Sequence, residues 1–384
     1  MQPVAVDGGP VSGQVYPNGG FTSVTICTPG TLTCNTIGGI LIDTGSSGLR
    51  VLASALPSLP VLTDGKGNAV SECAQFVDQS YLWGNVAVAD VRIAGEVASS
   101  ISIQAIADPT NFTIPSDCTS GGAGIDHDSQ LALGANGILG VGLEPQDCGI
   151  ACDPTSGAAA PAPVYYVCAA NACNPAFVLV PQQVTHPAVF FPKDNNGIAL
   201  QFSPLSGAAT TLSGSLTFGI GTQTNNTMGN ATIFTLGPTN QFTTNVFTTG
   251  QSLTASIDSG LSGIFFPDGG LPICPSPRSS LFCPTSPTAI TAVNVGTNSA
   301  QSMVNFTVDN ADNLFSGNPT DAAFSTLAGP SGAACTGGSQ DCSFAWGLPF
   351  FYGRTVFTAI SGQGVPSTAP PAPWWAYTIG FVPQ

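Results

Sequence analysis

The sequence predicts an all-β protein made of two similar halves. Short runs rich in Val, Ile, Thr and Phe recur between turn residues, whereas the periodicity of amphipathic helices is scarce. A weak internal repeat is the second observation: an apolar run leads into Asp, a hydroxyl residue and Gly once in each half. Each copy is followed far downstream by two apolar residues and Gly, so the halves match in more than one place.

The runs that we expect to form strands are rich in β-branched and aromatic residues and are bounded by Gly, Pro, Asn or Ser. They are Phe21–Cys27, Gly39–Asp43, Asn85–Ile93, Ser100–Ile106, Ser215–Gly219, Ala231–Leu236 and Met303–Val308. The chain has 384 residues, which is enough for two or three domains and for a large buried core.

The internal repeat defines two modules. The first copy reads Gly39-Ile-Leu-Ile-Asp-Thr-Gly-Ser-Ser-Gly, and the second reads Ala255-Ser-Ile-Asp-Ser-Gly-Leu-Ser-Gly. Gly140 ends a Gly-Ile-Leu-Gly segment 97 residues after Asp43. Gly347 ends a Phe-Ala-Trp-Gly segment 89 residues after Asp258. The shared order and similar spacing predict duplicated lobes, residues 1–195 with the Asp43 motif and residues 196–384 with the Asp258 motif.

The composition excludes several classes of function. Only 7% of residues are charged, and 6 Lys and Arg stand against 21 Asp and Glu, for a formal net charge of -15. So few cations cannot cover a phosphate backbone, which excludes nucleic-acid binding. Self-repulsion stays small when the carboxylates are protonated, so we expect tolerance of acid. No run of eighteen or more apolar residues occurs, which argues against a membrane-spanning helix.

The twelve cysteines predict disulfides. Four close pairs are bounded by turn residues, and two further pairs remain by elimination. The local pairs are Cys27–Cys34, Cys168–Cys173, Cys274–Cys283 and Cys335–Cys342, and the remaining pairs are Cys73–Cys118 and Cys148–Cys152. No Cys-x-x-Cys motif occurs and there are only two His, so we expect no zinc site. This pattern favours an oxidising compartment and a secreted, periplasmic or extracellular protein.

Other chemistries find little support in the sequence. The chain has no Gly-x-Ser-x-Gly elbow, P-loop, His-Glu-x-x-His motif or dinucleotide fingerprint. The acidic segments 126–128 and 309–313 fit no EF-hand loop and are better explained as turns. We therefore expect neither a metal nor a cofactor.

A single Asp at the end of a strand is usually a turn residue, but a pair across two lobes suggests chemistry. Two neighbouring carboxylates cannot both ionise easily, so one keeps a proton. The ionised one then accepts a proton from water while the neutral one donates to a carbonyl oxygen. Gly45 and Gly260 allow a tight turn after Asp43 and Asp258.

At these residues the sequence resembles the pepsin-like aspartic proteases, over most of the chain. The segments that carry the resemblance occur in the family's order: 42–47, 136–142, 213–219, 257–262, 346–357 and 379–382. More closely, the pattern is similar to an uncharacterised group of bacterial secreted proteins related to pepsins. The resemblance implies a bilobal fold of two pseudo-symmetric β-barrel lobes with a cleft between them. An extended polypeptide substrate would lie in that cleft.

The resemblance also implies roles for individual residues. Asp43 and Asp258 would form the catalytic dyad, because two aspartates that share one proton are the catalytic pair of this family. Thr44 and Ser259 would lock the two loops together. Ser46 would hydrogen-bond to the outer oxygen of Asp43.

Two positions depart from the family pattern. Leu261 stands where a hydroxyl residue would match Ser46, so we expect a raised pKa in the dyad or lower activity. Arg50 replaces the Trp that usually supports a flap tyrosine. The flap should lie between Phe76 and Gly84, with Tyr81 as the substrate-covering aromatic residue and Phe76 or Trp83 behind it.

These observations favour a monomeric acid endopeptidase that hydrolyses peptide bonds with water activated between two aspartates. The alternative is a non-catalytic secreted binding protein with the pepsin fold, suggested by Leu261, Arg50 and the altered flap. A structural surface or filament subunit is a further alternative, suggested by the low charge and the abundant Gly, Thr, Ser and Asn.

Overall fold

Strands dominate the computed structural model, which describes residues 1–107, 112–169, 172–331 and 343–378. Within these ranges two short α-helices occur, α1 at Gln130–Leu133 and α2 at Ala311–Gly317. Every run that we expected to form a strand overlaps one, and the first run coincides with β2 (Phe21–Cys27). The all-β class predicted from the sequence is therefore confirmed. No described helix combines the length and apolar character needed to cross a bilayer.

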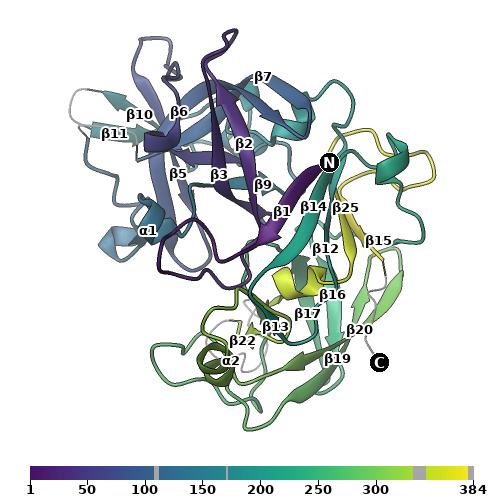
Figure 1. Cartoon of the computed structure of the whole chain (residues 1–384). Helices are drawn as coiled ribbons and strands as arrows, with labels where there is room; N and C mark the ends of the chain where they lie inside the picture. Colours follow the sequence, from purple (N-terminus) through teal and green to yellow (C-terminus); the bar gives the residue numbers. More distant parts are fainter. Residues whose placement is uncertain (108–111, 170–171, 332–342, 379–384) are drawn as a thin grey trace.

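The first half of the chain forms a curved set of strands, drawn in purple to blue in Figure 1. Their order in the sheet is β11-β10-β5-β6-β7-β4-β9-β3-β2. The remaining bounds are β3 (Cys34–Asp43), β4 (Ser47–Leu52), β5 (Ala69–Gln75), β6 (Ser80–Ile93), β7 (Glu96–Ile106), β8 (Ile125–Asp126), β9 (Gly137–Val141), β10 (Tyr165–Ala169) and β11 (Ala172–Pro175).

The same sheet continues through the N-terminal strand β1 into strands from the second half, in the order β1-β14-β12-β24-β25-β15. The N-terminal strand β1 (Gln2–Val6) pairs antiparallel with β14 (Leu212–Phe218), with Gln2 opposite Leu216. The other bounds are β12 (Gly197–Phe202), β15 (Thr232–Thr235), β24 (Thr355–Ala359) and β25 (Trp374–Tyr377). The domain boundary predicted after residue 195 falls just before β12. Strand β1 precedes this boundary in the sequence but pairs with β14, which follows it.

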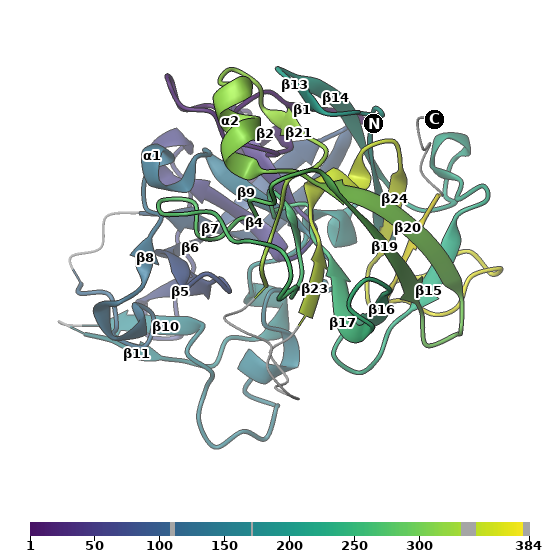
Figure 2. The ribbon, with the colours of Figure 1, turned by 90° about the horizontal axis from the view of Figure 1, so that it is seen from below.

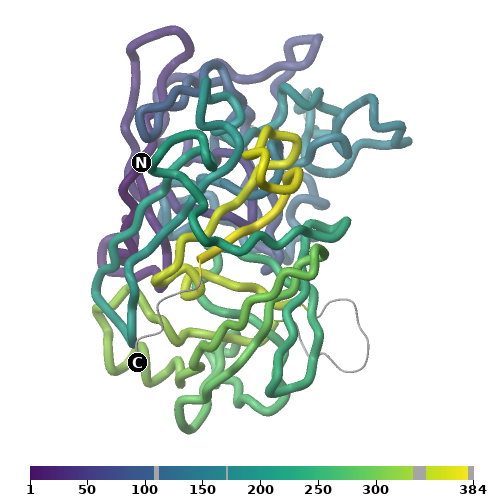
Figure 3. Tube along the Cα trace, turned by 90° about the vertical axis from the view of Figure 1, so that its right-hand side faces the viewer, coloured from purple at the N-terminus to yellow at the C-terminus, as the bar shows by residue number. Residues whose placement is uncertain are grey.

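A separate seven-stranded sheet belongs to the second half, in the order β20-β19-β16-β17-β23-β18-β22. Its strands are β16 (Phe242–Val246), β17 (Gln251–Ile257), β18 (Ile264–Phe265), β19 (Thr288–Val295), β20 (Gln301–Val308), β22 (Ala328–Gly329) and β23 (Ser343–Trp346). A further two-stranded sheet consists of β13 (Ala208–Ala209) and β21 (Ala323–Phe324). Figure 2 shows the early strands gathered on one side and β16, β17, β19 and β20 on the other. In Figure 3 the purple-to-blue part of the chain lies mainly above the green part.

The internal repeat of the sequence is a repeat of topology. Strand β9 lies between β3, to which it is parallel, and β4, to which it is antiparallel. Strand β23 lies in the same way between β17 and β18. This arrangement requires glycine at position 140, because a Cβ there would lie 2.8 Å from the carbonyl oxygen of Gly48. The apolar-apolar-Gly segments therefore mark the strand that inserts beside each aspartate.

Disulfides connect close segments of the chain. Five of the predicted bridges are present: Cys27–Cys34, Cys73–Cys118, Cys148–Cys152, Cys168–Cys173 and Cys274–Cys283. The sixth predicted pair, Cys335 with Cys342, lies outside the described residues, as does the segment 379–382.

Asn18 connects the loop between β1 and β2 to the second half of the chain. Its Nδ2 donates to the carbonyl oxygens of Ser262 at 2.6 Å and of Phe324 at 2.9 Å. Its Oδ1 accepts from the Phe324 amide and from the Tyr352 hydroxyl, both at 2.7 Å. The side chain is fully buried, and its φ of 51° lies in the left-handed region that Asn tolerates. One buried amide therefore satisfies four polar groups, three of them on buried residues.

Replacing Asn18 should destabilise the fold strongly. Asn18→Ala leaves buried donors and acceptors without partners, so we expect a loss of about 3 kcal/mol in the free energy of unfolding, measured by chemical denaturation. Asn35→Ala is the matched control, because Asn35 is exposed and makes a single side-chain bond to the Ala55 carbonyl. It should change stability by less than about 0.5 kcal/mol. Equal losses in the two variants would contradict the role given to Asn18.

Candidate active site

Asp43 and Asp258 occupy equivalent places in the two halves. Asp43 is the last residue of β3, and Asp258 directly follows β17. In each case the backbone turns so that the glycine two residues later donates its amide to the carboxylate. The distances are 2.8 Å from Gly45 N to Asp43 Oδ1 and 2.9 Å from Gly260 N to Asp258 Oδ1. Each carboxyl group is therefore held by its own turn.

Reciprocal hydrogen bonds join the two turns. The Thr44 hydroxyl donates to the Ile257 carbonyl at 3.2 Å and accepts from the Ser259 amide at 2.9 Å. The Ser259 hydroxyl donates to the Ile42 carbonyl at 2.8 Å and accepts from the Thr44 amide at 3.1 Å. Both side chains are buried. Each hydroxyl thus satisfies a main-chain donor and a main-chain acceptor of the opposite half.

The glycines of the two turns leave room for the carboxyl groups. A Cβ at Gly260 would lie 2.7 Å from Asp43 Oδ1 and 3.2 Å from Asp258 Oδ1. A Cβ at Gly45 would overlap the Asp258 carboxylate. The two carboxyl groups therefore lie side by side, each against the glycine of the other half.

The environments of the two aspartates differ. Burial raises the pKa of Asp258 well above its usual value, and the charge of Asp43 and a hydrogen bond with Asp43 raise it further. Asp43 accepts a hydrogen bond from the Ser46 hydroxyl through Oδ2 as well as the Gly45 amide through Oδ1. Leu261 occupies the position that matches Ser46 and has no hydroxyl group. Its amide donates to the main-chain oxygen of Asp258 at 3.3 Å, and the amides of Gly260 and Leu261 oppose the rise in the pKa of Asp258. Burial and the adjacent Asp43 thus favour the protonated form of Asp258.

Buried aromatic residues support the strand that carries Asp258. The Asp258 amide donates to the Trp346 carbonyl at 3.0 Å. The Trp346 indole is fully buried, packs against Phe344 with 4.3 Å between ring centroids, and donates to Thr244 and Asn294 at 3.1 Å. Trp346 therefore fixes the end of β17 through both packing and polar contacts.

Both aspartates line a cleft with a volume of about 760 Å³ between the two halves. The first half contributes the tip of the β5–β6 hairpin, and the second half contributes residues 239–241, Leu261 and Trp375. This volume is in the range of pockets that bind small molecules or peptide segments.

The hairpin formed by β5 and β6 holds the residues that we expected to cover a substrate. Phe76 lines the cleft together with the tip residues Val77 and Asp78. Tyr81 and Trp83 are 6% and 4% exposed and belong to a separate buried cluster, where Trp83 packs edge-on against Tyr166 at 5.3 Å. Neither lines the cleft, so this placement does not support a substrate-covering role for Tyr81 or Trp83.

Arg50 is the centre of a buried ion network whose members, Arg50, Glu72 and Asp147, line the cleft. Its Nη2 lies 2.5 Å from Glu72 Oε1 and 3.2 Å from Asp147 Oδ2, and its Nη1 donates to the Ser47 carbonyl at 2.9 Å. The Tyr165 hydroxyl donates to Asp147 Oδ1 at 2.6 Å. The sequence marks Arg50 as unusual but does not predict its partners. A buried Arg must be paired, so an acidic residue inside an apolar strand, such as Glu72 in β5, was the available signal.

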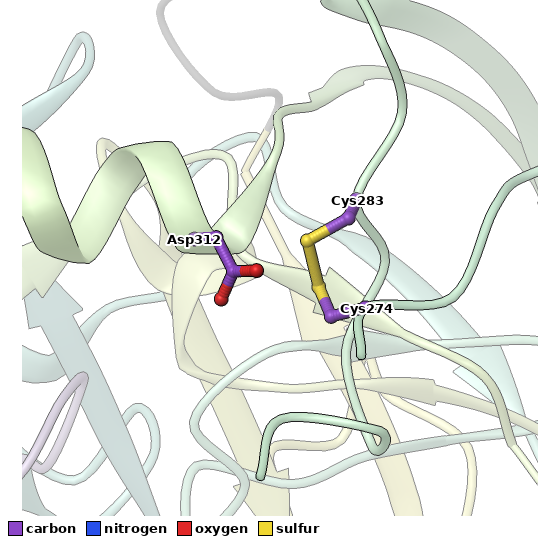
Figure 4. A group of neighbouring side chains, drawn as sticks. All are labelled: Cys274, Cys283 and Asp312. Carbon is purple, nitrogen blue, oxygen red and sulfur yellow. A yellow bond between two sulfur atoms is a disulfide. The ribbon is translucent and has the colours of Figure 1, made fainter. Parts of the chain in front are cut away.

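A cluster of Cys274, Cys283 and Asp312 has the composition of a metal site, but its contacts give another explanation. The two cysteines are joined in a disulfide, as Figure 4 shows, and so offer no thiolate. Asp312 pairs with Arg278 at 2.7 Å. The cluster is a disulfide next to a surface ion pair.

A side chain at Gly260 should disrupt the junction of the two halves. Gly260→Ala places a Cβ against both carboxyl groups, so we expect a loss of about 1–3 kcal/mol in unfolding free energy, measured by chemical denaturation. Gly38→Ala is the matched control, because Gly38 is exposed and a Cβ there meets no atom within 4 Å. A Gly260→Ala protein as stable as the control would show that the two turns are further apart than described.

The raised pKa of Asp258 predicts how stability depends on pH. A carboxyl group with a raised folded-state pKa stabilises the fold fully below its unfolded pKa of about 3.9, and the contribution is lost as pH rises through the folded value. Asp258→Asn removes this dependence. The difference in melting temperature between Asp258→Asn and wild type should therefore shift in favour of the variant from about pH 4 upward. A difference that is constant with pH would contradict the raised pKa.

Comparisons with known proteins agree with this fold. The crystal structure of an aspartic proteinase from Irpex lacteus matches with a TM-score of 0.58 and 13% sequence identity, covering 99% of this chain and 96% of that chain. No curated protein sequence matches. The bilobal pepsin-like fold expected from the sequence is thus confirmed. The family model described as "Protein of unknown function (DUF3443)" matches residues 1–377, and the chain belongs to this family.

Proposed function

We propose that this protein is an acid endopeptidase in which Asp43 and Asp258 activate a water molecule. One observation carries the proposal: the reciprocal Thr44–Ser259 bonds hold two carboxyl groups of unequal environment together in a cleft lined by both halves. The structural similarity to the Irpex lacteus aspartic proteinase supports it. The proposal includes two lobes, residues 1–195 and 196–384.

In the proposed mechanism the two aspartates take different steps. Asp43, which accepts bonds from Ser46 and Gly45, takes a proton from water as the water oxygen attacks the peptide carbonyl carbon. Asp258 donates its proton to the carbonyl oxygen, which yields a neutral tetrahedral intermediate. The proton on Asp43 then moves to the amide nitrogen, the C–N bond breaks, and Asp258 recovers a proton from the collapsing hydroxyl group.

The cleft also indicates the form of the substrate. It is open and lined from both halves, and the hairpin tip with Phe76 borders it, which suits an extended polypeptide segment rather than a folded domain. The five disulfides support an oxidising location, and we propose a secreted or periplasmic protein that acts as a monomer.

One observation favours a second function, a secreted polypeptide-binding protein without catalysis. The Ser46 hydroxyl donates a hydrogen bond to Asp43, but Leu261, at the equivalent position after Asp258, has no hydroxyl group. Asp258 therefore lacks one orienting partner, and a cleft of this shape can bind a polypeptide without cleaving it.

Digestion of denatured casein between about pH 2 and pH 7 tests the proposal. Cleavage should be present at acid pH and should fall as pH rises through the raised pKa of Asp258, because the general acid loses its proton. Asp43→Asn should lower kcat by at least about 100-fold. Asp312→Asn is the matched control, since that carboxylate pairs with Arg278 outside the cleft, and it should retain wild-type activity.

Two results would count against catalysis by this dyad. Full activity in purified Asp43→Asn would exclude the mechanism. A wild-type protein that binds denatured casein at acid pH without cleaving it would establish the binding function instead.

A further inference from the structure

Tyr16 lies in the loop between β1 and β2 and reaches the candidate active site. Figure 1 shows this purple loop running along the boundary between the early and late strands. Tyr16 lines the same cleft as Asp43 and Asp258. Burial and then the charges of Asp43, Asp258 and Asp78 raise the pKa of its phenol to about 12. Tyr16 is therefore within electrostatic reach of both the dyad and the hairpin tip.

Neighbouring residues pack closely around the Tyr16 ring and hold it in place. It packs edge-on against Phe21, with ring centroids 5.6 Å apart and an interplanar angle of 87°. A Cβ at Gly19 would lie 2.6 Å from Tyr16 Cδ1, and a Cβ at Gly134 would lie 2.6 Å from Tyr16 Cδ2. The absence of side chains at these two glycines admits the ring. The Tyr16 amide also donates to the Gly8 carbonyl at 2.8 Å, so backbone and ring are both held.

The hydroxyl at the end of this fixed ring is free. Among the described residues it has no hydrogen-bond partner, whereas the hydroxyls of Tyr165 and Tyr352 donate at 2.6 Å and 2.7 Å. A tyrosine hydroxyl inside a protein usually finds a partner, so a free one in a cleft is available to a ligand. With its raised pKa the phenol stays protonated at all pH values of interest and can donate.

The hairpin tip offers no equivalent donor. Phe76, Val77 and Asp78 line the cleft but carry no hydroxyl group. The nearby Ser80 hydroxyl already donates to Asp78 Oδ1 at 2.6 Å. Two aromatic residues of the described cleft, Tyr16 and Trp375, have a donor without a hydrogen-bond partner. The charges of Asp43 and Asp258 act on the Tyr16 phenol, which places this donor beside the dyad.

We infer that the Tyr16 hydroxyl is a substrate-binding group that donates a hydrogen bond to a main-chain carbonyl of an extended polypeptide beside the bond to be cleaved. The inference rests on the proposed function and assigns to the β1–β2 loop the contact that the sequence led us to expect from the hairpin. A main-chain carbonyl is the suitable partner because a phenol donor needs an acceptor, and every residue of a polypeptide provides one.

Tyr16→Phe tests the inference, because it keeps the ring and removes the donor. With denatured casein at acid pH we expect kcat/KM to fall about 10-fold, the amount that one hydrogen bond supplies, while the melting temperature stays unchanged. Tyr81→Phe makes the same chemical change at the hairpin position and should alter kcat/KM by less than about twofold. Unchanged kcat/KM in Tyr16→Phe, or the larger loss in Tyr81→Phe, would overturn the inference.

A binding measurement separates this inference from the proposed function. In the Asp43→Asn background, calorimetry with oxidised insulin B chain as the probe should give a dissociation constant about 10-fold higher when Tyr16 is also changed to Phe. If the wild-type protein cleaves nothing, the proposed catalysis fails, but this comparison still decides the role of Tyr16. Equal dissociation constants with and without the Tyr16→Phe change would refute that role even if cleavage is present.

Discussion

The reciprocal hydrogen bonds between Thr44 and Ser259 are the interaction on which the rest of the site depends. Each hydroxyl is buried and serves both as donor and as acceptor for the main chain of the other half, so neither can be lost without leaving buried polar groups unpaired. These bonds set how close the two turns approach. That approach leaves space only for glycine at positions 45 and 260, and it brings two carboxyl groups within reach of one proton.

Once the carboxyl groups are adjacent, their local contacts differ. Ser46 and the Gly45 amide donate hydrogen bonds to Asp43, while burial and the neighbouring Asp43 raise the pKa of Asp258. A related balance exists among three other residues that line the cleft. Burial raises the pKa of Glu72, Arg50 opposes this effect, and Asp147 reinforces it. Arg50 thus allows two further carboxyl groups to sit at the base of the β5–β6 hairpin at a tolerable energetic cost.

The sequence predicted the features that depend on local chemistry. Residues close together in the chain determine the strands, the short-range disulfides and the paired Asp-hydroxyl-Gly turns. Each downstream segment ends in Gly because another stretch of backbone approaches it closely. The hairpin residues were harder to assign. Tyr81 and Trp83 are two residues apart in β6, so their side chains share one face. Trp83 lies opposite Cys73 in β5. The disulfide between Cys73 and Cys118 belongs to the same buried cluster as Tyr81 and Trp83. Tyr16 could not be predicted, because contacts such as those of Asn18, with residues about 250 to 330 positions away, place its loop.

The pairing of β1 with β14 affects the order in which parts of the molecule fold. Residues 2–6 meet partners at 212–216, and β24 and β25 near the end of the described chain complete the same sheet. Closing so long a loop adds little to the equilibrium cost but slows folding, because non-local pairing forms after local hairpins. During synthesis, β1 must wait while roughly 200 further residues emerge, at about 5–20 residues per second. The junction of the two halves, and any activity that needs it, therefore forms only after β14, Ser259 and the strands β24 and β25 have been made.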